Sequence, residues 1–149
     1  MAVTTFVKGD IIRTEDPAFE MVYRPLDVAT PPDIGVCGVL DAGDDLVIAD
    51  GTAAQTKKIG VRTSFVDAES GNVGFLLRGY IVQLAQVDLQ VDEYVKPDST
   101  GEPTLADPGA AADEEVIYGT VVGKANTNDQ TTRITALAQE LVIIKVGDF

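Results

Sequence analysis

Apolar and polar residues alternate most regularly in the segment Gln86-Val87-Asp88-Leu89-Gln90-Val91-Asp92. In an extended chain, Val87, Leu89 and Val91 fall on one side and the polar residues on the other. A period of two is typical of a β-strand with one buried face and one solvent-exposed face. The alternation therefore predicts a strand over residues 86–92.

From Ile34 onward, short β-branched runs lie on either side of segments rich in Gly, Asp, Asn and Pro. Such pairs of runs predict β-hairpins. The three predicted hairpins join residues 35–40 to 46–49, residues 58–66 to 73–85, and residues 93–96 to 102–105. The runs 116–124 and 141–146 predict two further strands.

One stretch has a helix-like spacing, because Ile134, Leu137, Ala138 and Leu141 follow the positions i, i+3, i+4 and i+7. We expect a strand here, with one or two helical turns as the alternative. Many strands at intervals of roughly ten residues, with no sustained helical pattern, predict an all-β fold. The expected architecture is an antiparallel barrel or sandwich of short strands with an extended N-terminal arm.

Residues 1–34 differ from the rest of the chain, because prolines interrupt them and their apolar residues have no steady period. Proline favours extended backbone and removes a hydrogen-bond donor. We therefore predict an arm over residues 1–34 and a β-domain over residues 35–149. The alternative is an edge strand and loop of the same domain. The large apolar side chains predicted to anchor the arm on a partner are Phe6, Ile11, Ile12, Phe19 and Tyr23.

Charge adds a second expectation. The chain has 24 acidic and 11 basic residues and a net charge of −13. A surface of this kind repels phosphate backbones, so no nucleic-acid partner is expected. Dispersed carboxylates also suit the proteins of salt-loving organisms, where the Debye length is only a few ångströms. An acidic protein from an ordinary habitat is the alternative.

The sequence lacks most of the residues and motifs that support catalysis or metal binding. The sequence has no histidine and a single cysteine, Cys37, within an apolar run, so neither a zinc site nor an intramolecular disulfide is expected. Cys37 is predicted to be a buried small hydrophobe. No phosphate-binding glycine loop or nucleophile elbow is present. We expect no catalytic residues, no metal and no cofactor. With neither a membrane span nor a secretion signal in view, we expect a soluble protein made inside a cell.

Residues 34–146 carry a looser but longer pattern. A Gly-rich apolar run is followed by Val91-Asp92-Glu93-Tyr94-Val95-Lys96-Pro97-Asp98-Ser99-Thr100-Gly101, then by Tyr118-Gly119-Thr120-Val121-Val122-Gly123 and a final valine-rich strand. This succession resembles the head-decoration, or capsid cement, proteins of tailed viruses.

The resemblance implies a structural virion protein and not an enzyme. It would be made in the host cytoplasm and would sit on the outside of an icosahedral capsid, where it clamps junctions between major capsid proteins. The implied partners are the major capsid protein and other copies of the chain, commonly in trimers, with no membrane. The predicted arm anchors would then contact the capsid or a neighbouring copy.

Two other functions are alternatives to this role. Ala42-Gly43-Asp44-Asp45-Leu46, Gly71-Asn72-Val73-Gly74, Arg78-Gly79 and Leu84-Ala85-Gln86-Val87 resemble fragments of the trimeric all-β deoxyuridine triphosphatases. The resemblance fails at the aspartate that orients the attacking water, because Phe75-Leu76-Leu77 occupies that interval. A β-sandwich adhesion or ligand-binding module, with or without calcium, is the non-enzymatic alternative.

Overall fold

The computed structural model describes residues 5–12, 20–26, 30–40, 46–51, 59–126 and 135–147. Within these ranges the chain forms short antiparallel strands and one four-residue helix, so the predicted all-β class is confirmed. The elements are β1 (Ile11–Ile12), β2 (Glu20–Arg24), β3 (Cys37–Leu40), β4 (Leu46–Ile48), β5 (Gly60–Val66), β6 (Val73–Leu84), β7 (Tyr94–Pro97), β8 (Pro103–Leu105), α1 (Ala111–Glu114), β9 (Gly119–Lys124) and β10 (Leu141–Val146).

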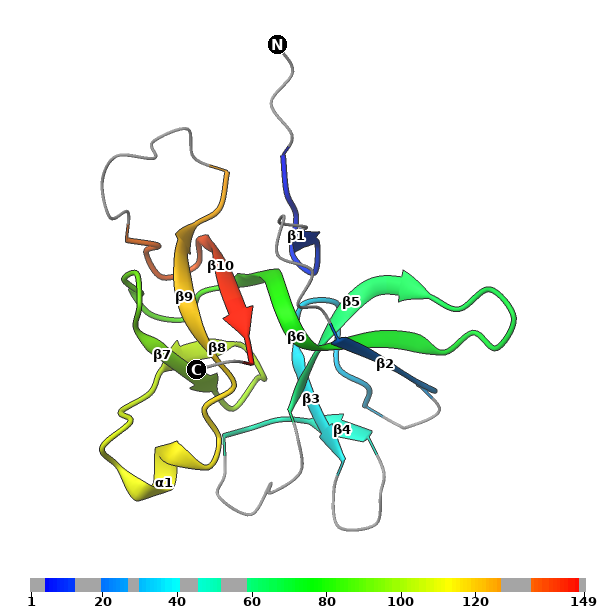
Figure 1. The fold of residues 1–149 in the computed structure, drawn as a ribbon, viewed down its shortest axis with the longest axis horizontal. Helices are drawn as coiled ribbons and strands as arrows, with labels where there is room; N and C mark the ends of the chain where they lie inside the picture. Colours follow the sequence, from blue (N-terminus) through cyan, green and yellow to red (C-terminus); the bar gives the residue numbers. More distant parts are fainter. Residues whose placement is uncertain are drawn as a thin grey trace.

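The long strand β6 is the spine of a single curved sheet, which forms a half-barrel (Figure 1). The strand order is β4-β3-β5-β6-β10-β9-β7-β8, and β1 and β2 also pair with β6. The first half of β6 lies between β5 and β2, and its second half lies between β10 and β1. Gly79, with a φ of +134°, stands where the partners change. A non-glycine residue rarely adopts such a backbone conformation, so glycine lets β6 pass from one half of the sheet to the other.

The two ends of the half-barrel meet at the turn between β7 and β8. The Cys37 N–H donates to the Gly101 carbonyl across 2.8 Å. Gly101 has a φ of +82°, and a Cβ at this position would lie 2.5 Å from the Val36 Cγ1 atom. Glycine is therefore required here both for its left-handed backbone and for the close approach of the turn to β3.

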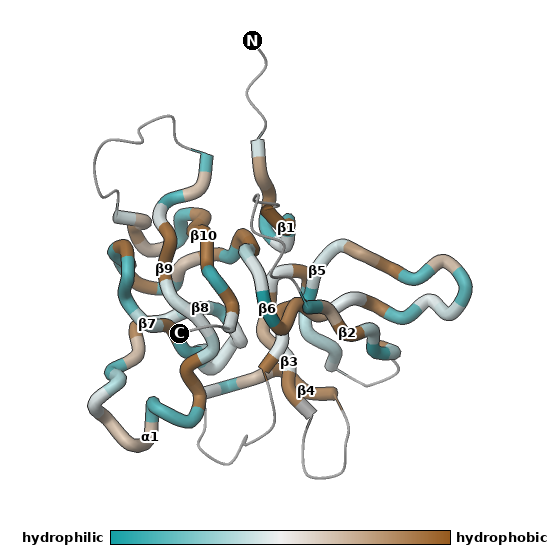
Figure 2. Tube along the Cα trace, viewed as in Figure 1, coloured by the Kyte–Doolittle hydropathy of each residue, from teal (hydrophilic) through white to brown (hydrophobic). Residues whose placement is uncertain are grey.

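The main core is built from both halves of the sheet, and apolar stretches follow β3, β4 and β10 (Figure 2). A second, smaller core contains Leu46, Val73 and Phe75, with Val22 and Leu26 packed against it. Each large apolar side chain that is fully buried contributes about 1.5–3 kcal/mol. Among the largest buried side chains of the main core are Val61, Leu76, Ile81, Leu89, Val95, Val121 and Ile144.

All three predicted hairpins are confirmed: β3 pairs with β4, β5 with β6, and β7 with β8. Strands β9 and β10 confirm the two single-strand predictions. The sharp reversals after β5 and β7 contain Gly71 and Gly101, and both have positive φ values. The glycines thus mark the turns as the sequence pattern indicated.

The predicted strand over residues 86–92 is wrong. Leu89 alone forms an isolated bridge, with Ala136, while Val87 is 37 % exposed. The segment turns instead, because Asp92 has a φ of +71° and the Glu93 N–H donates to the Gln90 carbonyl. The chain must bend here to pass from the end of β6 into β7, and this tertiary requirement overrides the local alternation.

The strand predicted for the stretch with helix-like spacing, Ile134 to Leu141, also needs correction. Ile134 lies outside the described residues, and residues 135–140 form neither a continuous strand nor a helix. Ala136 makes the bridge to Leu89, and the Glu140 N–H then donates to the Leu137 carbonyl in a turn. Gln139 has a φ of +70°, which a right-handed helix does not allow.

The described parts of the N-terminal region join the same sheet, since β1 and β2 both pair with β6. Ile11 packs against the main core, and Val22 packs against the second one. The division between an arm and a domain at residue 34 stays a prediction. In the part of the chain that the structure describes, no helix has the length and apolar character that crossing a membrane requires.

Candidate interaction surface

The structure separates the predicted anchors into two groups. Phe6, Ile11 and Ile12 lie on one segment beside the second half of β6, and all three are half-buried. Tyr23 lies on β2 and is 43 % exposed. Phe19 falls outside the described residues. Tyr23 is therefore the most accessible of the four anchors whose positions are known.

Residues 5–12, which we call the strap, are tied to three distant parts of the sheet. The Gly9 N–H donates to the Val82 carbonyl across 2.8 Å, and the Val82 N–H donates to the Asp10 carbonyl across 2.9 Å. At the end of β9, the Asn126 side chain makes a reciprocal pair with the backbone of Phe6, accepting its N–H at 2.7 Å and donating to its carbonyl at 2.8 Å. The strap is thus held by specific hydrogen bonds as well as by β1.

A third contact joins the strap to the turn before β8. The Lys8 ammonium forms an ion pair with the Glu102 carboxylate, which also accepts a hydrogen bond from the Gln86 amide. Glu102 is buried, with 6 % of its surface exposed. A buried carboxylate requires such partners because its charge has lost contact with water. The Lys8–Glu102 pair therefore holds the strap against the turn between β7 and β8, where the two ends of the half-barrel meet.

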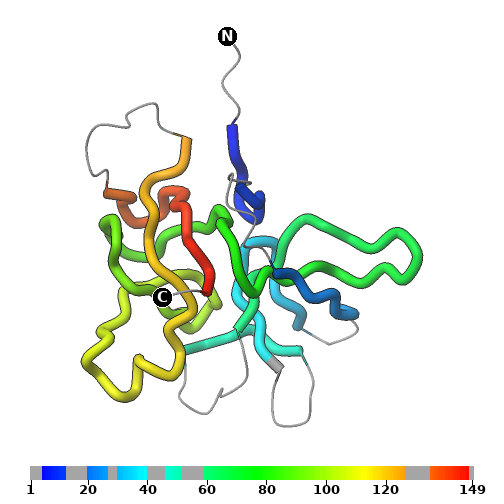
Figure 3. Tube along the Cα trace, viewed as in Figure 1, coloured from blue at the N-terminus to red at the C-terminus, as the bar shows by residue number. Residues whose placement is uncertain are grey.

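Away from the strap, a three-stranded extension leaves the body of the molecule (Figures 1 and 3). We call it the wing and define it as β2, β5 and residues 73–78 of β6. Its strands are held together by β2–β6 and β5–β6 pairing, and each of these pairings contains a register shift. In β5 the shift falls between Arg62 and Val66, where the Thr63 hydroxyl donates to the Gly74 carbonyl at 2.8 Å. Bulges of this kind increase the local twist and redirect side chains.

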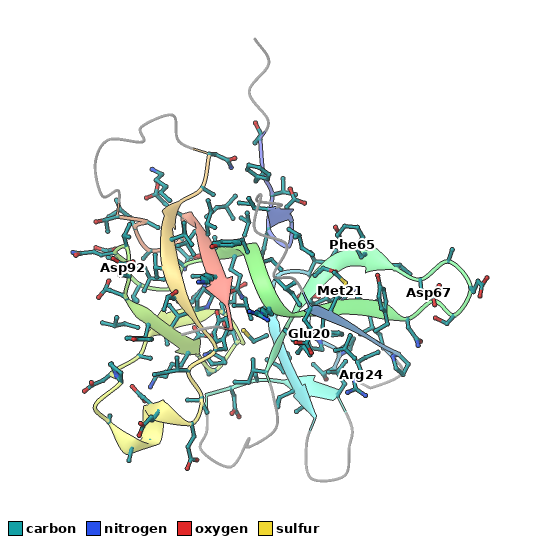
Figure 4. The ribbon with its side chains drawn as sticks, viewed as in Figure 1. Glu20, Met21, Arg24, Phe65, Asp67 and Asp92 are labelled. Atoms are coloured by element: carbon teal, nitrogen blue, oxygen red, sulfur yellow. The ribbon has the colours of Figure 1, made fainter. Side chains whose placement is uncertain are left out.

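One face of the wing carries a patch of large side chains. Tyr23 pairs with Gly74, and Met21 packs directly over that glycine, where a Cβ would lie 2.3 Å from the Met21 Sδ atom. On the other side of β6, Val66 pairs with Val73, and the preceding residue, Phe65, lies within the register shift of β5. Figure 4 labels Met21 on β2 and Phe65 on β5, the two strands that flank β6 in the wing. Phe65 is 40 % exposed, and Met21, Tyr23 and Phe65 together form what we call the wing patch.

Sequence reasoning missed Phe65 and Met21 as surface residues. Phe65 belongs to a hairpin strand that the sequence predicted. Whether its side chain is buried depends on whether other strands or loops cover that end of the hairpin. The only signal in the sequence is two consecutive apolar residues, Phe65 and Val66, at the end of a strand that leads into the polar turn 67–72. Consecutive apolar residues break a period of two, so at least one of them is expected to face solvent in a one-sided sheet.

The opposite end of the molecule is acidic. Residues 105–115, which we call the acidic end, contain Leu105, 47 % exposed on β8, followed by four carboxylates and no basic residue. Asp113 accepts hydrogen bonds from the Asp107 N–H and from the Lys96 ammonium, and these contacts lower the pKa of its carboxyl group. Lys96 therefore compensates Asp113. The carboxylates of Asp107, Glu114 and Glu115 remain on the surface.

A buried polar group lies between the halves of the sheet. The Gln83 amide donates to the Gly35 carbonyl at 2.9 Å and accepts the Tyr118 hydroxyl at 2.6 Å. Its nitrogen also lies 3.7 Å from the Cys37 Sγ atom. Burial raises the pKa of the Cys37 thiol to about 12 and raises that of Tyr118 well above its usual value. Cys37 is thus a buried small hydrophobe, as predicted.

The fragments that resemble a deoxyuridine triphosphatase do not lie close together within one chain. Gly71-Asn72-Val73-Gly74 lies at the tip of the wing, whereas Leu84-Ala85-Gln86-Val87 follows the other end of β6. Gly74 and Leu84, the nearest residues of the two fragments, are ten residues apart along β6, which is roughly 33 Å of extended chain at ~3.3 Å per residue. Residues 42–45 lie outside the described part. Within the described ranges, no group of three or more His, Cys, Asp or Glu side chains is placed to hold a metal ion.

No protein-family model matches the chain, and no curated protein is significantly similar to it.

Proposed function

We propose that this protein is a structural virion protein that decorates the outside of an icosahedral capsid and clamps junctions between major capsid proteins. The observation that carries the proposal is the wing, which presents exposed Tyr23 and Phe65 side chains on a projection of an otherwise compact half-barrel. Aromatic side chains of this size supply most of the binding energy at protein interfaces. The resemblance of residues 34–146 to head-decoration proteins supports the same role.

The fold suits a clamp. In the described part of the chain ten strands form one continuous sheet, and the strap, which contains β1, is also fixed to it by the Lys8–Glu102 pair and the Asn126 contacts. A rigid unit loses little conformational entropy on binding, so more of its contact energy appears as affinity. Many such units bound around a shell reinforce one another through multivalency. The predicted anchors Phe6, Ile11, Ile12, Phe19 and Tyr23 would contact the capsid or a neighbouring copy.

The test is binding to capsids that lack decoration. The protein is mixed with such capsids, and its sedimentation with them and their resistance to heat are measured. Saturable binding that raises heat resistance is the expected result. Tyr23→Ser is expected to weaken binding at least tenfold, while Val122→Ser, an exposed change on β9, leaves it unchanged.

Point variants are preferable to removal of residues 1–24, because that truncation deletes both β1 and β2 and opens both cores. If the folded wild-type protein ignores undecorated capsids at micromolar concentration and in molar salt, the decoration role is wrong. If it binds but Tyr23→Ser binds equally well, the role stands and Tyr23 is not an anchor.

A further inference from the structure

The strand β2 forms an edge of the sheet. Among the residues that the structure describes, β2 pairs with β6 and with no other strand. Figure 1 shows β2 along the border of the wing. In an edge strand, alternate N–H and C=O groups point away from the sheet and can pair with another chain. β2 therefore has one hydrogen-bonding edge that a further extended strand can occupy.

The side chains of β2 alternate between its two faces. Glu20, Val22 and Arg24 lie on one face, and Met21 and Tyr23 lie on the other, which is the face of the wing patch. Figure 4 labels Glu20 and Arg24, which stand at opposite ends of the strand. The strand thus begins with a negative charge and ends with a positive charge on the same face.

The sequence of this strand is complementary to itself. When two copies of β2 pair antiparallel with Val22 opposite Val22, Glu20 of each copy lies opposite Arg24 of the other. Met21 of each copy then lies opposite Tyr23 of the other. Opposite charges and methionine–aromatic contacts are both favourable between neighbouring strands. Pairing centred one residue earlier or later would set a charged residue opposite Val22.

We propose that two copies of this chain associate by antiparallel pairing of their β2 strands about a two-fold axis at Val22. The contact is self-complementary, as a two-fold interface requires. It joins the two wings into one continuous sheet and brings the two wing patches together on one face. The inference rests on β2 and its neighbours and goes beyond the capsid role, which does not require it.

The charges on β2 favour a second copy as the strand that occupies this edge. Among the described residues, no ion pair or hydrogen bond joins the Arg24 side chain to another. Glu20 is in register with Arg78 on the β6 side of the strand, so Arg24 of the second copy approaches it from the opposite side. A carboxylate has two oxygens that accept hydrogen bonds, and it can therefore contact both arginines.

Sedimentation velocity tests the contact. The wild-type chain should pass from monomer to dimer between about 1 μM and about 1 mM, because a contact of this size belongs to the weak class of protein interfaces. At about 0.15 M salt the Debye length is ~8 Å, so repulsion between distant charges is screened while pairs in direct contact persist.

Reversing either charge should weaken association at least tenfold, because Arg24→Glu and Glu20→Arg each create two like-charged pairs in the contact. Arg24→Glu makes the chain more negative and Glu20→Arg makes it less negative, so an effect of net charge alone would change their affinities in opposite directions. Val122→Glu is the control, since Val122 is 40 % exposed on β9, outside the contact.

Mixing the two reversed variants makes the test specific for antiparallel pairing. Arg24→Glu has a glutamate at both ends of β2, and Glu20→Arg has an arginine at both ends. When one pairs with the other, every charge faces its opposite. The mixture should therefore form a one-to-one dimer at least tenfold more tightly than either variant does alone.

Circular dichroism establishes first that each variant is folded. If Glu20→Arg does not fold beside Arg78, cysteine pairing tests the same register. A mixture of Met21→Cys and Tyr23→Cys should form a mixed disulfide. Each variant alone should not, because identical positions are then diagonal neighbours ~7–8 Å apart, too far for a disulfide. The natural Cys37 is buried and does not interfere.

Three results would overturn the proposal: a wild-type monomer over the whole concentration range, charge reversals that do not both weaken association, or a mixture that forms neither the charge-paired dimer nor the mixed disulfide. Capsid binding is measured separately on Arg24→Glu, whose changed side chain lies on the face opposite the wing patch. Failure of self-association and failure of the decoration role are thereby distinguished.

Discussion

At the scale of single residues, the structure depends on a few groups at the joint between the two halves of the sheet. Gln83 is fully buried, yet its amide has partners on both of its polar atoms, Gly35 and Tyr118. Removing one partner of a buried polar group costs about 1–3 kcal/mol, because the other is left unsatisfied. The halves of the sheet are therefore fixed to each other by hydrogen bonding as well as by apolar packing.

Cys37 gives a direct measure of this burial. Its thiol is fully buried and has its pKa raised to about 12, so it is neutral at ordinary pH. Only the thiolate reacts with a disulfide reagent. At pH 8 we expect a disulfide reagent to label Cys37 of the denatured chain within seconds. Over the same time it should not label Cys37 of the folded protein. Fast labelling of the folded protein would show that the joint opens readily.

Gly101 is expected to be far less replaceable than Gly71. Both have positive φ values, +82° and +76°, but a Cβ at Gly101 would meet Val36, Ile48 and the Cys37 carbonyl, whereas a Cβ at Gly71 would have no atom within 4 Å. Gly71→Ala should cost about 1–2 kcal/mol for the backbone alone. Gly101→Ala should cost about 2 kcal/mol more, from overpacking at the seam.

Chemical denaturation of the two alanine variants gives the difference directly, since the backbone penalty is common to both. If Gly71→Ala and Gly101→Ala lost equal amounts of unfolding free energy, the turn before β8 would not be closely packed against β3.

At the scale of elements, local patterns predicted most hairpins because turn residues are a local property. Gly71 and Gly101 mark their turns by sequence alone, and the flanking β-branched runs supply the strands. The strand predictions are wrong for residues 86–92 and 135–140. There Leu89 pairs only with Ala136, which is far from it in the sequence, and a local pattern does not encode such a contact. It also missed the wing patch, because the exposure of Phe65 depends on where the sheet ends. Of the four candidate anchors that the structure describes, only Tyr23 lies on an exposed surface.

The attachment of the strap leads to a prediction about ion pairs. Lys8→Met leaves the buried Glu102 carboxylate with the Gln86 amide but without its counter-charge. Because Lys8 itself is 31 % exposed, we expect a loss of about 1–3 kcal/mol in unfolding free energy. Lys124→Met is the control, since in the Lys124–Glu140 pair both side chains are about one-third exposed. Surface pairs of this kind contribute about 0–1 kcal/mol.

Hydrogen exchange distinguishes a loosened strap from a general loss of stability. The Val82 N–H donates to the Asp10 carbonyl, so its protection reports on the strap, whereas the Ala49 N–H, bonded to Cys37, reports on the other half of the sheet. Lys8→Met should speed exchange at Val82 more than at Ala49. An equal change at both sites would contradict a local role for the ion pair.

The loop between β8 and α1 should respond to acid through Asp113. Hydrogen bonds from the Asp107 N–H and Lys96 lower the pKa of Asp113, so the folded state binds this proton less readily than the unfolded chain. Such a group stabilises the fold above its unfolded pKa, and that contribution is lost as the pH falls below about 4. Asp113→Asn should therefore destabilise the protein at pH 7 and make little difference near pH 2. Glu115→Gln, on an exposed side chain, serves as the control.

At the scale of the whole molecule, the net charge of −13 opposes both folding and assembly. Repulsion among carboxylates acts over a Debye length of ~10 Å at 0.1 M salt and only ~3 Å at 1 M. If the acidic surface is an adaptation to high salt, the melting temperature should rise steeply between about 0.1 and 1 M potassium chloride and then level off. Exclusion of salt from apolar surface has a different signature, because its effect continues to grow with concentration.

Neutralising exposed acids separates charge from other effects of salt. Glu114→Gln with Glu115→Gln removes two negative charges from the acidic end without touching a buried residue. At ~0.1 M salt this double variant should melt at a higher temperature than the wild type, and at ~1 M the two should converge, since screening has already removed the repulsion. Wild-type melting temperatures that are the same at both salt concentrations would show that the carboxylates are simply solvated, and the halophilic interpretation would then be abandoned.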